Sequence, residues 1–135
     1  IQGQEEARET KEAEEQDMPV IRLSSVKNTK NKYVEQAVQQ IREHYQEDIN
    51  ISTVAGELEI SEGYLSRVFK KETDYTFTSY LTLYRMKKAM TLLKDCRVKV
   101  YEVAEQVGYS DTAYFSAQFK KVTGISPSEY QDRSR

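Results

Sequence analysis

The 135-residue sequence is poor in residues on which several protein classes depend. One cysteine excludes an internal disulfide and suits a reducing cytoplasm. Two prolines, beside 38% hydrophobic and 31% charged residues, favour a soluble helical protein over a strand-rich or disordered one. No stretch approaches the roughly 20 apolar residues of a membrane span, and the first residues do not resemble a signal peptide.

The same scarcity argues against an enzyme. The single histidine, His44, has no second histidine with which to bind a metal, so we expect a partly exposed helix residue. Cys96 is most simply a small apolar residue that follows a helix. Because the sequence has neither a phosphate-binding glycine run nor clustered carboxylates, we expect no catalytic site, no metal and no cofactor.

Charge is distributed unevenly along the chain. Residues 1–17 carry seven acidic and two basic side chains, a net charge of −5, whereas residues 18–135 carry a net charge of +3. We expect residues 1–29 to form an acidic, largely disordered tail or linker. Because the chain opens at Ile1 without an initiator methionine, we also expect it to be part of a longer protein. A mildly basic body is compatible with nucleic-acid binding, but many proteins that bind no nucleic acid share it.

From residue 31 onward the apolar residues recur with the period of an α-helix. The first stripe contains Val34, Val38, Ile41 and Tyr45. A short helix follows with Ser52 as its expected N-cap, and the last helix is expected to have a capping box of Ser126 and Glu129 around Pro127. The longest run predicts an inward side made of Phe77, Tyr80, Leu81, Tyr84, Ala89, Leu92 and Leu93. The predicted helices cover 31–45, 52–60, 62–72, 77–95, 100–107, 111–122 and 127–132.

The chain contains nearly the same octapeptide twice, YLSRVFKK at 64–71 and YFSAQFKK at 114–121. The similarity extends to a longer alignment, with Val54, Ala55 and Ser61 matching Val103, Ala104 and Ser110 at an offset of 49 residues. From Tyr64 and Tyr114 onward the offset is 50, so one residue is inserted in the second copy. Two copies separated by a long helix indicate a bipartite domain rather than a solenoid.

Each copy is predicted to form a short helix, a tight turn and a second helix, the helix-turn-helix pattern. Gly108 suits the left-handed turn of the second copy, whereas Glu59 in the first copy implies a different turn or strain of about 1 kcal/mol. The predicted fold is therefore all-α, with seven helices. It comprises a first subdomain at 30–76, a linker helix at 77–95 and a second subdomain at 96–135.

The second helix of each copy has a polar outward side. In the first copy this side contains Gly63, Ser66, Arg67 and Lys70, and in the second copy Thr112, Ala113, Ser116, Ala117 and Lys120. Small residues would let such a helix enter a major groove, where arginine can bind guanine and lysines can neutralise phosphates. One such helix alone is better explained as a solvated surface, but its repetition in register favours DNA binding. A linker helix of roughly 27 Å could hold two such helices about one DNA turn apart.

The sequence resembles the DNA-binding domain of the AraC/XylS family of bacterial transcription regulators over roughly residues 31–133. The resemblance rests on YLSRVFKKET, on Arg85, Ala89, Leu92 and Leu93 in the linker helix, and on VAEQVGYSDTAYFSAQFKKVTGISPSEY. It implies a cytoplasmic regulator that binds double-stranded DNA, with RNA polymerase as a further candidate partner. The acidic leader and long first helix are similar to the effector end of AraC-type two-component response regulators. We therefore expect a receiver or sensor domain to precede residue 1.

The resemblance also implies which residues contact DNA. Base-reading positions fall at Gly63, Ser66, Arg67, Thr112, Ala113, Ser116 and Ala117, and phosphate contacts at Lys70, Lys71, Lys120 and Lys121. The family often has arginine where this chain has Ala117, and a larger residue where it has Gly63. We therefore predict that Arg67 supplies most of the base discrimination. The second unit is expected to act through phosphate contacts and through alanine methyl groups against thymine.

The main alternative is a helical protein-interaction module that does not bind DNA. Salt-dependent binding to random DNA separates the two hypotheses, because phosphate contacts give a steep negative salt slope. The operator, the target genes, the inducing signal, the choice between activation and repression and the oligomeric state do not follow from these residues.

Overall fold

The computed structural model describes residues 31–134, which form seven α-helices and no strand. The expected acidic tail at 1–29 lies outside these residues. The helices are α2 (Lys32–His44), α3 (Ile51–Glu57), α4 (Glu62–Thr73), α5 (Phe77–Leu93), α6 (Val100–Gln106), α7 (Thr112–Thr123) and α8 (Pro127–Arg133). The predicted all-α, two-unit fold is confirmed. None of these helices has the length and apolar character needed to cross a membrane.

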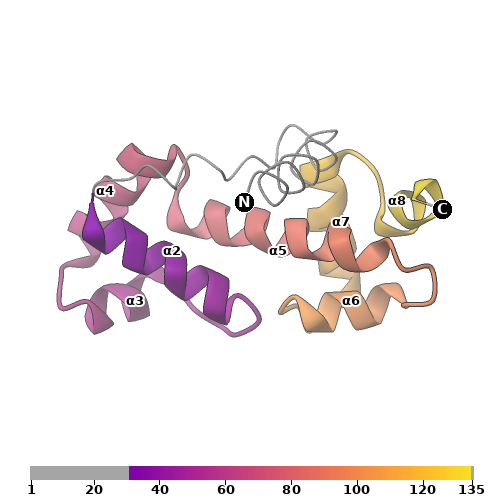
Figure 1. Ribbon diagram of the computed structural model, residues 1–135, viewed down its shortest axis with the longest axis horizontal. Coiled ribbons are helices and arrows are strands. Elements are labelled where there is room, and N and C mark those ends of the chain that lie inside the picture. Colours follow the sequence, from indigo (N-terminus) through magenta and orange to yellow (C-terminus); the bar gives the residue numbers. More distant parts are fainter. Residues whose placement is uncertain (1–30, 135) are drawn as a thin grey trace, which may run out of the picture.

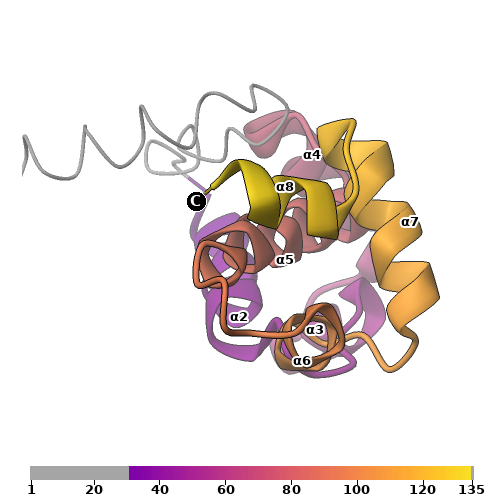
Figure 2. The same cartoon turned by 90° about the vertical axis from the view of Figure 1, so that its right-hand side faces the viewer.

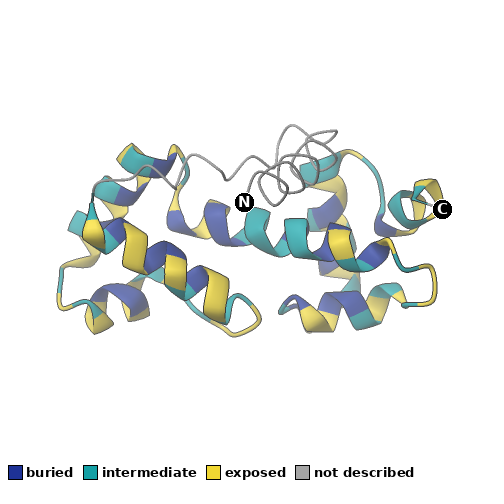
Figure 3. Ribbon diagram, viewed as in Figure 1, coloured by how far each residue is buried: buried dark blue, intermediate teal, exposed yellow. Residues whose placement is uncertain are grey.

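Two helical units share the long helix α5, which runs along the longest axis of the molecule (Figure 1). The first unit packs α2, α3 and α4 around the beginning of α5, and the second packs α6, α7 and α8 around its end. Each unit has its own buried cluster, one centred on Ile41, Leu65 and Phe69 and the other on Phe115 and Phe119. Buried residues lie on the inner sides of the helices and exposed residues on their outer sides (Figure 3).

Helix α5 serves both clusters by burying different sides of its two halves. Phe77, Tyr80 and Leu81 belong to the first cluster, and Met86, Ala89, Met90 and Leu93 to the second. Phe77 and Met86 are nine residues apart, which is two and a half helical turns, so they point in opposite directions. The sequence pattern identified five of these seven buried residues. It missed Met86 and Met90 because it assumed one apolar side, and it included Tyr84 and Leu92, which are only half-buried.

The turns between the two helices of each unit have the same hydrogen bonds. Glu59 N donates to Gly56 O and Ile60 N to Ala55 O in the first unit. Gly108 N donates to Glu105 O and Tyr109 N to Ala104 O in the second. Glu59 has a φ of 59° and Gly108 a φ of 100°, so both lie in the left-handed region. Of the two possibilities open for the first turn, the structure therefore has the strained one.

The helix N-termini correct two details of the predicted alignment. The N-cap of α3 is Asn50, whose side chain accepts from Thr53 N, so the assignment of Ser52 is wrong. The N-cap of α4 is Ser61, whose hydroxyl accepts from Tyr64 N, and the N-cap of α7 is Asp111, whose carboxylate accepts from Tyr114 N. Ser61 is thus equivalent to Asp111 rather than to Ser110, which makes Ser110 the inserted residue.

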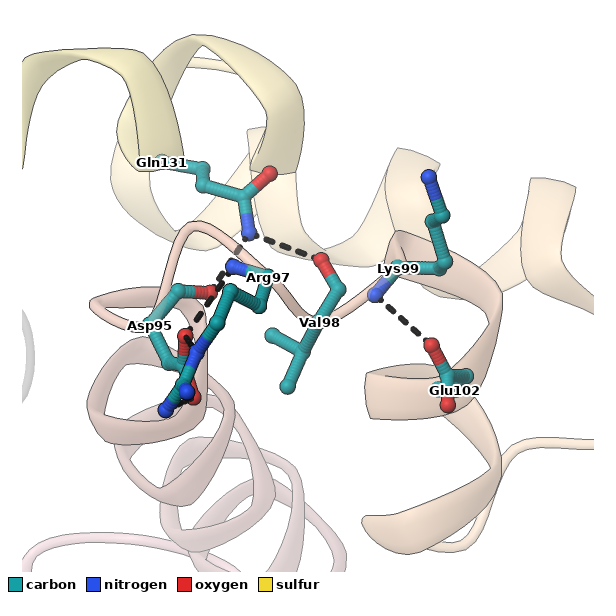
Figure 4. A network of polar contacts seen from close by, with 6 residues as sticks. All are labelled: Asp95, Arg97, Val98, Lys99, Glu102 and Gln131. Carbon is teal, nitrogen blue, oxygen red and sulfur yellow. Dashed lines mark hydrogen bonds and ion pairs between the residues drawn. The ribbon is translucent and has the colours of Figure 1, made fainter.

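The C-terminal helix α8 ties down the loop that leaves α5. The Gln131 amide donates to the carbonyl oxygens of Asp95, at 3.1 Å, and Val98, at 3.0 Å (Figure 4). Ser126 caps α8 as predicted, with its hydroxyl accepting from Glu129 N. The Glu129 carboxylate accepts from Arg133, so it does not complete the expected capping box.

Candidate nucleic-acid interface

The second helix of each unit, α4 or α7, lies on the same side of α5 (Figure 2). Along the longest axis the two helices are far apart, with α4 near one end and α7 towards the other (Figure 1). The predicted site residues therefore lie on two separate helices that share one side of α5. Helices α4 and α7 are the two helices that the sequence assigned to reading DNA.

On α4 the predicted reading residues are all exposed. Leu65, Phe69 and Thr73 are buried against the first unit. The exposed residues of this helix include Gly63, Ser66, Arg67, Lys70 and Lys71. No protein atom outside the local chain lies within 4 Å of the position that a Gly63 side chain would occupy, so this part of the helix can approach a groove closely.

Arg67 is supported by an aromatic pair. Its guanidinium carbon lies 5.5 Å from the centroid of the Tyr64 ring, one helical turn earlier. Tyr33 of α2 meets that ring edge-on, with centroids 6.1 Å apart and an interplanar angle of 84°. The Asn31 amide donates to the Tyr64 hydroxyl at 3.5 Å. A cation held over an aromatic ring loses less side-chain freedom on binding, so the Arg67 guanidinium is already partly oriented in the free protein.

On α7 the predicted reading residues are smaller and slightly less exposed. Ala113 and Ala117 are exposed, whereas Thr112 and Ser116 are half-buried. Phe115 and Phe119 point into the second cluster. The outward side of α7 therefore offers methyl and hydroxyl groups but no long side chain in its first half except Tyr114.

Tyr114 is a surface residue that the sequence pattern did not single out. It is 56% exposed and is one of two large exposed hydrophobic side chains in residues 31–134. Its equivalent, Tyr64, is half-buried because Tyr33 packs against it, whereas the ring near Tyr114 is that of Tyr109, tilted at a centroid distance of 5.9 Å. The octapeptide is the same at this position in both copies, so only the surrounding helices distinguish the two tyrosines.

The four predicted phosphate-binding lysines lie in the last turns of α4 and α7. All of them are exposed. The Lys70 ammonium donates to the Asp74 carbonyl at 3.1 Å, so it also caps its own helix. Lysines in a last turn are favoured by the helix dipole as well, which is a structural reason for their presence. Lys121 also borders a groove of about 560 Å³ between α5 and α7, together with Tyr75, Thr78, Ser79, Thr82, Leu83, Gln118 and Val122.

Charge is segregated between the helices rather than in excess overall. Residues 31–134 contain 14 Lys and Arg against 15 Asp and Glu. Helices α2 and α3, with the loop between them, carry a net charge of −3, whereas α7 carries +2 and α4 carries +1. The predicted reading helices are therefore positively charged within a nearly neutral domain, as is α5, which carries +3. Binding to a polyanion would depend on orientation rather than on net charge.

The described residues contain no group of three or more His, Cys, Asp or Glu side chains that could hold a metal ion. His44 is half-buried at the end of α2, and its ring is paired with Glu47. That hydrogen bond is the main cause that raises the pKa of His44 above its usual value of 6.5. Cys96 is exposed in the loop after α5.

Comparisons with known proteins agree with this arrangement. A family described as a helix-turn-helix domain matches residues 54–133. The transcriptional regulatory protein HptR of Staphylococcus aureus is 40% identical over 98 residues, which are 73% of this chain and 38% of that protein. The chain spans about two fifths of the length of the curated relatives it matches.

Two solved structures have the same fold. The C-terminal domain of AraT, a response regulator from Geobacillus stearothermophilus, is 40% identical with a TM-score of 0.74, covering 78% of this chain and 87% of that one. The DNA-binding domain of AdpA, solved in complex with a target DNA, is 25% identical with a TM-score of 0.72, covering 78% of this chain and 95% of that one.

Proposed function

The chain belongs to the AraC-type helix-turn-helix family of DNA-binding transcription regulators, and from this membership we propose that it binds double-stranded DNA through α4 and α7. Each helix enters one of two successive segments of the major groove. The observation that carries the proposal is the position of two equivalent, positively charged helices on one side of a shared helix (Figure 2). The DNA-binding domain of AdpA, which has the same fold and was solved in complex with a target DNA, supports the proposal.

Base discrimination is assigned mainly to Arg67. Its guanidinium is exposed and held over Tyr64, where it can donate two hydrogen bonds to the O6 and N7 atoms of a guanine. Two small residues lie near Arg67 on the same helix: Gly63 about one turn before it and Ser66 directly before it. They leave room for the helix to approach the bases. Loss of such a bidentate contact costs about 1–3 kcal/mol at one base pair.

The second unit contributes affinity more than discrimination. Ala113 and Ala117 present methyl groups that can contact thymine, and Thr112 and Ser116 present hydroxyls that can bind either bases or phosphates. Lys120 and Lys121 neutralise phosphates. We add Tyr114 to this set, because a half-exposed ring with a hydroxyl beside Ala117 is suited to contact the sugar-phosphate backbone.

The test begins by selecting a preferred site from random-sequence duplexes and then changing each base pair of that site in turn. Arg67→Ala should lower affinity for the selected site about 10- to 100-fold and flatten preference at one base pair, without changing preference at the α7 half-site. Lys71→Ala is the matched control: it should weaken binding to all sequences alike and reduce the salt slope by about 0.9. The assignment of base discrimination mainly to Arg67 is wrong if Thr112→Ala or Ala117→Lys changes base preference more than Arg67→Ala does.

If the chain binds no duplex in a salt-dependent manner, the alternative of a protein-interaction module is favoured instead. With all four lysines on phosphates, the slope of log affinity against log salt should be about −4. A slope near zero would contradict the phosphate assignments.

For the complete protein we propose a cytoplasmic two-component regulator in which a receiver domain precedes residue 1. The proposal is supported by a curated response regulatory protein that is more than twice as long as its matched part, and by a solved relative that is the C-terminal domain of a response regulator. RNA polymerase is the further partner that an activator of this kind would need. The coding sequence upstream of Ile1 shows directly whether it encodes a receiver domain. Transcription in vitro by RNA polymerase, from a promoter that carries the selected site, tests whether the polymerase is a partner.

A further inference from the structure

A single arginine at the midpoint of α5 connects the two units. Arg85 is half-buried, with eight residues of α5 on either side of it. Its Nε atom donates to the Tyr45 carbonyl at 2.7 Å, and its Nη2 atom donates to the Glu47 carbonyl at 2.9 Å. Both carbonyls belong to the chain that leaves α2, so the guanidinium is fixed to the end of the first unit.

The other side of the same guanidinium contacts the second unit. Its carbon lies 5.4 Å from the centroid of the Tyr109 ring, in the turn between α6 and α7. Gly108 comes even closer: a side-chain carbon added there would lie 3.2 Å from Arg85 Cζ and 3.0 Å from the Tyr45 carbonyl oxygen. The end of α2, the middle of α5 and the turn before α7 therefore meet at this one side chain.

This junction lies between two otherwise separate clusters. Among the partly buried hydrophobic side chains of the described residues, Tyr45 and Leu83 alone pack against both clusters. Helix α7 begins four residues after Gly108, so the position of this turn relative to α2 fixes the position of α7 relative to α4. A helix such as α5 can bend gently along its length, and Arg85 adds a second connection beside it that resists this movement.

We propose that Arg85 is a positioning residue that sets the spacing and phase at which the two reading helices meet DNA. The inference rests on the proposed function, because it supposes that α4 and α7 bind two segments of one duplex. One base pair added between the half-sites moves the second by about 3.4 Å along the axis and by about 35° around it. A rigid pair of helices cannot follow that displacement, whereas a loosened pair can follow part of it.

The test is a series of duplexes in which the distance between the two selected half-sites is changed by one and two base pairs in each direction. Wild-type chain should lose at least tenfold in affinity for each single step. Arg85→Met retains the length and apolar contact of the side chain but removes its hydrogen bonds and charge. It should bind the best duplex more weakly and lose less than threefold per step. Lys94→Met removes one charge from the exposed end of the same helix and should keep the wild-type spacing profile.

Two results overturn the inference in different ways. If Arg85→Met keeps the tenfold loss per step, Arg85 does not set the spacing, and the proposed function stands. If wild-type chain itself binds all spacings equally, the bipartite mode of binding fails and the inference fails with it.

A measurement without DNA covers the case in which Arg85→Met does not fold. Spin labels are placed at the equivalent exposed positions Lys71→Cys and Lys121→Cys in a Cys96→Ser background. Pulsed dipolar spectroscopy should give one narrow distance distribution for the wild-type junction. The distribution should be broader for Arg85→Lys, whose side chain cannot make both hydrogen bonds and still lie over Tyr109. Equal widths would overturn the proposal.

Discussion

The same turn occurs with glutamate in one unit and glycine in the other, which allows its backbone strain to be measured. Glu59 has a φ of 59° and Gly108 a φ of 100°. The left-handed conformation costs an L-residue roughly 1–2 kcal/mol. Glycine relieves this cost but gains freedom in the unfolded chain, which offsets about 0.4–1 kcal/mol. Glu59→Gly should therefore stabilise the domain by about 0.5–1 kcal/mol.

The reverse substitution has a different size because of its surroundings. In Gly108→Ala the new methyl group would have the same backbone strain and would also lie 3.0 Å from the Tyr45 carbonyl oxygen and 3.2 Å from Arg85. A side chain added at Gly56, a glycine of the first unit, would have no such neighbour within 4 Å. We expect Gly108→Ala to destabilise the domain by about 2 kcal/mol or more, since a backbone oxygen cannot move aside cheaply.

Urea unfolding monitored by circular dichroism measures both effects, because a change of 1 kcal/mol moves the midpoint by about 0.5 M at an ordinary slope. Glu59→Ala is the control: it removes the same negative charge but keeps the β-carbon and its strain. If Glu59→Ala stabilises the domain as much as Glu59→Gly does, the gain comes from charge and the reasoning about the backbone is refuted. An unchanged midpoint in Gly108→Ala would refute it equally.

Three further predictions concern the frame that holds the reading helices. Ser61→Ala and Asp111→Ala should each cost about 1 kcal/mol in the free energy of unfolding, because each removes an N-cap, whereas Ser61→Asp should keep it. Burial raises the pKa of Tyr80 from 10 to about 12, with the nearby Arg42 charge opposing the shift. The folded state thus holds that proton more tightly, and its stabilisation is complete below pH 10 and is lost as the pH rises towards 12. Tyr80→Phe should accordingly show a shallower loss of stability between pH 10 and 12 in unfolding experiments. Gln131→Leu should lower stability by about 1–2 kcal/mol, measured by urea midpoint, because two loop carbonyls lose their donor.

Much of the fold could be predicted because the sequence repeats its own pattern. Phe69 and Phe119 occupy equivalent places, and Thr73 and Thr123 make the same hydrogen bonds, to Phe69 and Phe119 carbonyls respectively, at 2.8 Å each. A pattern of residues that recurs at a fixed offset predicts structure more reliably than a single copy does. Chance would have to place the same residue types at the same spacing twice. The outward positions on α4 and α7 followed from the same periodicity.

Local capping was harder to predict, because several polar residues compete for one helix terminus. Asn50 and Ser52 are both good N-caps, and the choice depends on which backbone angle the preceding loop imposes. Likewise Ser110 and Asp111 are adjacent candidates, and only the hydrogen bond to Tyr114 N shows that Asp111 caps the helix.

Contacts between helices that are distant in the sequence could not be predicted from periodicity at all. Tyr64 and Tyr114 are the same residue in the same octapeptide, yet Tyr33 covers only the first. Arg85 was recognised as part of a linker-helix pattern, but its bonds to Tyr45 and Glu47 join residues about 40 positions apart. Such contacts arise from how the helices are placed in space, which a local pattern does not encode.

Hydroxyl-radical footprinting of the chain on its selected duplex tests the central claim most directly. If α4 and α7 face the same side of the molecule and read successive major-groove segments, two protected regions should appear with centres about 10–10.5 base pairs apart on one face of the duplex. A single protected region, or two regions on opposite faces of the duplex, would contradict the account.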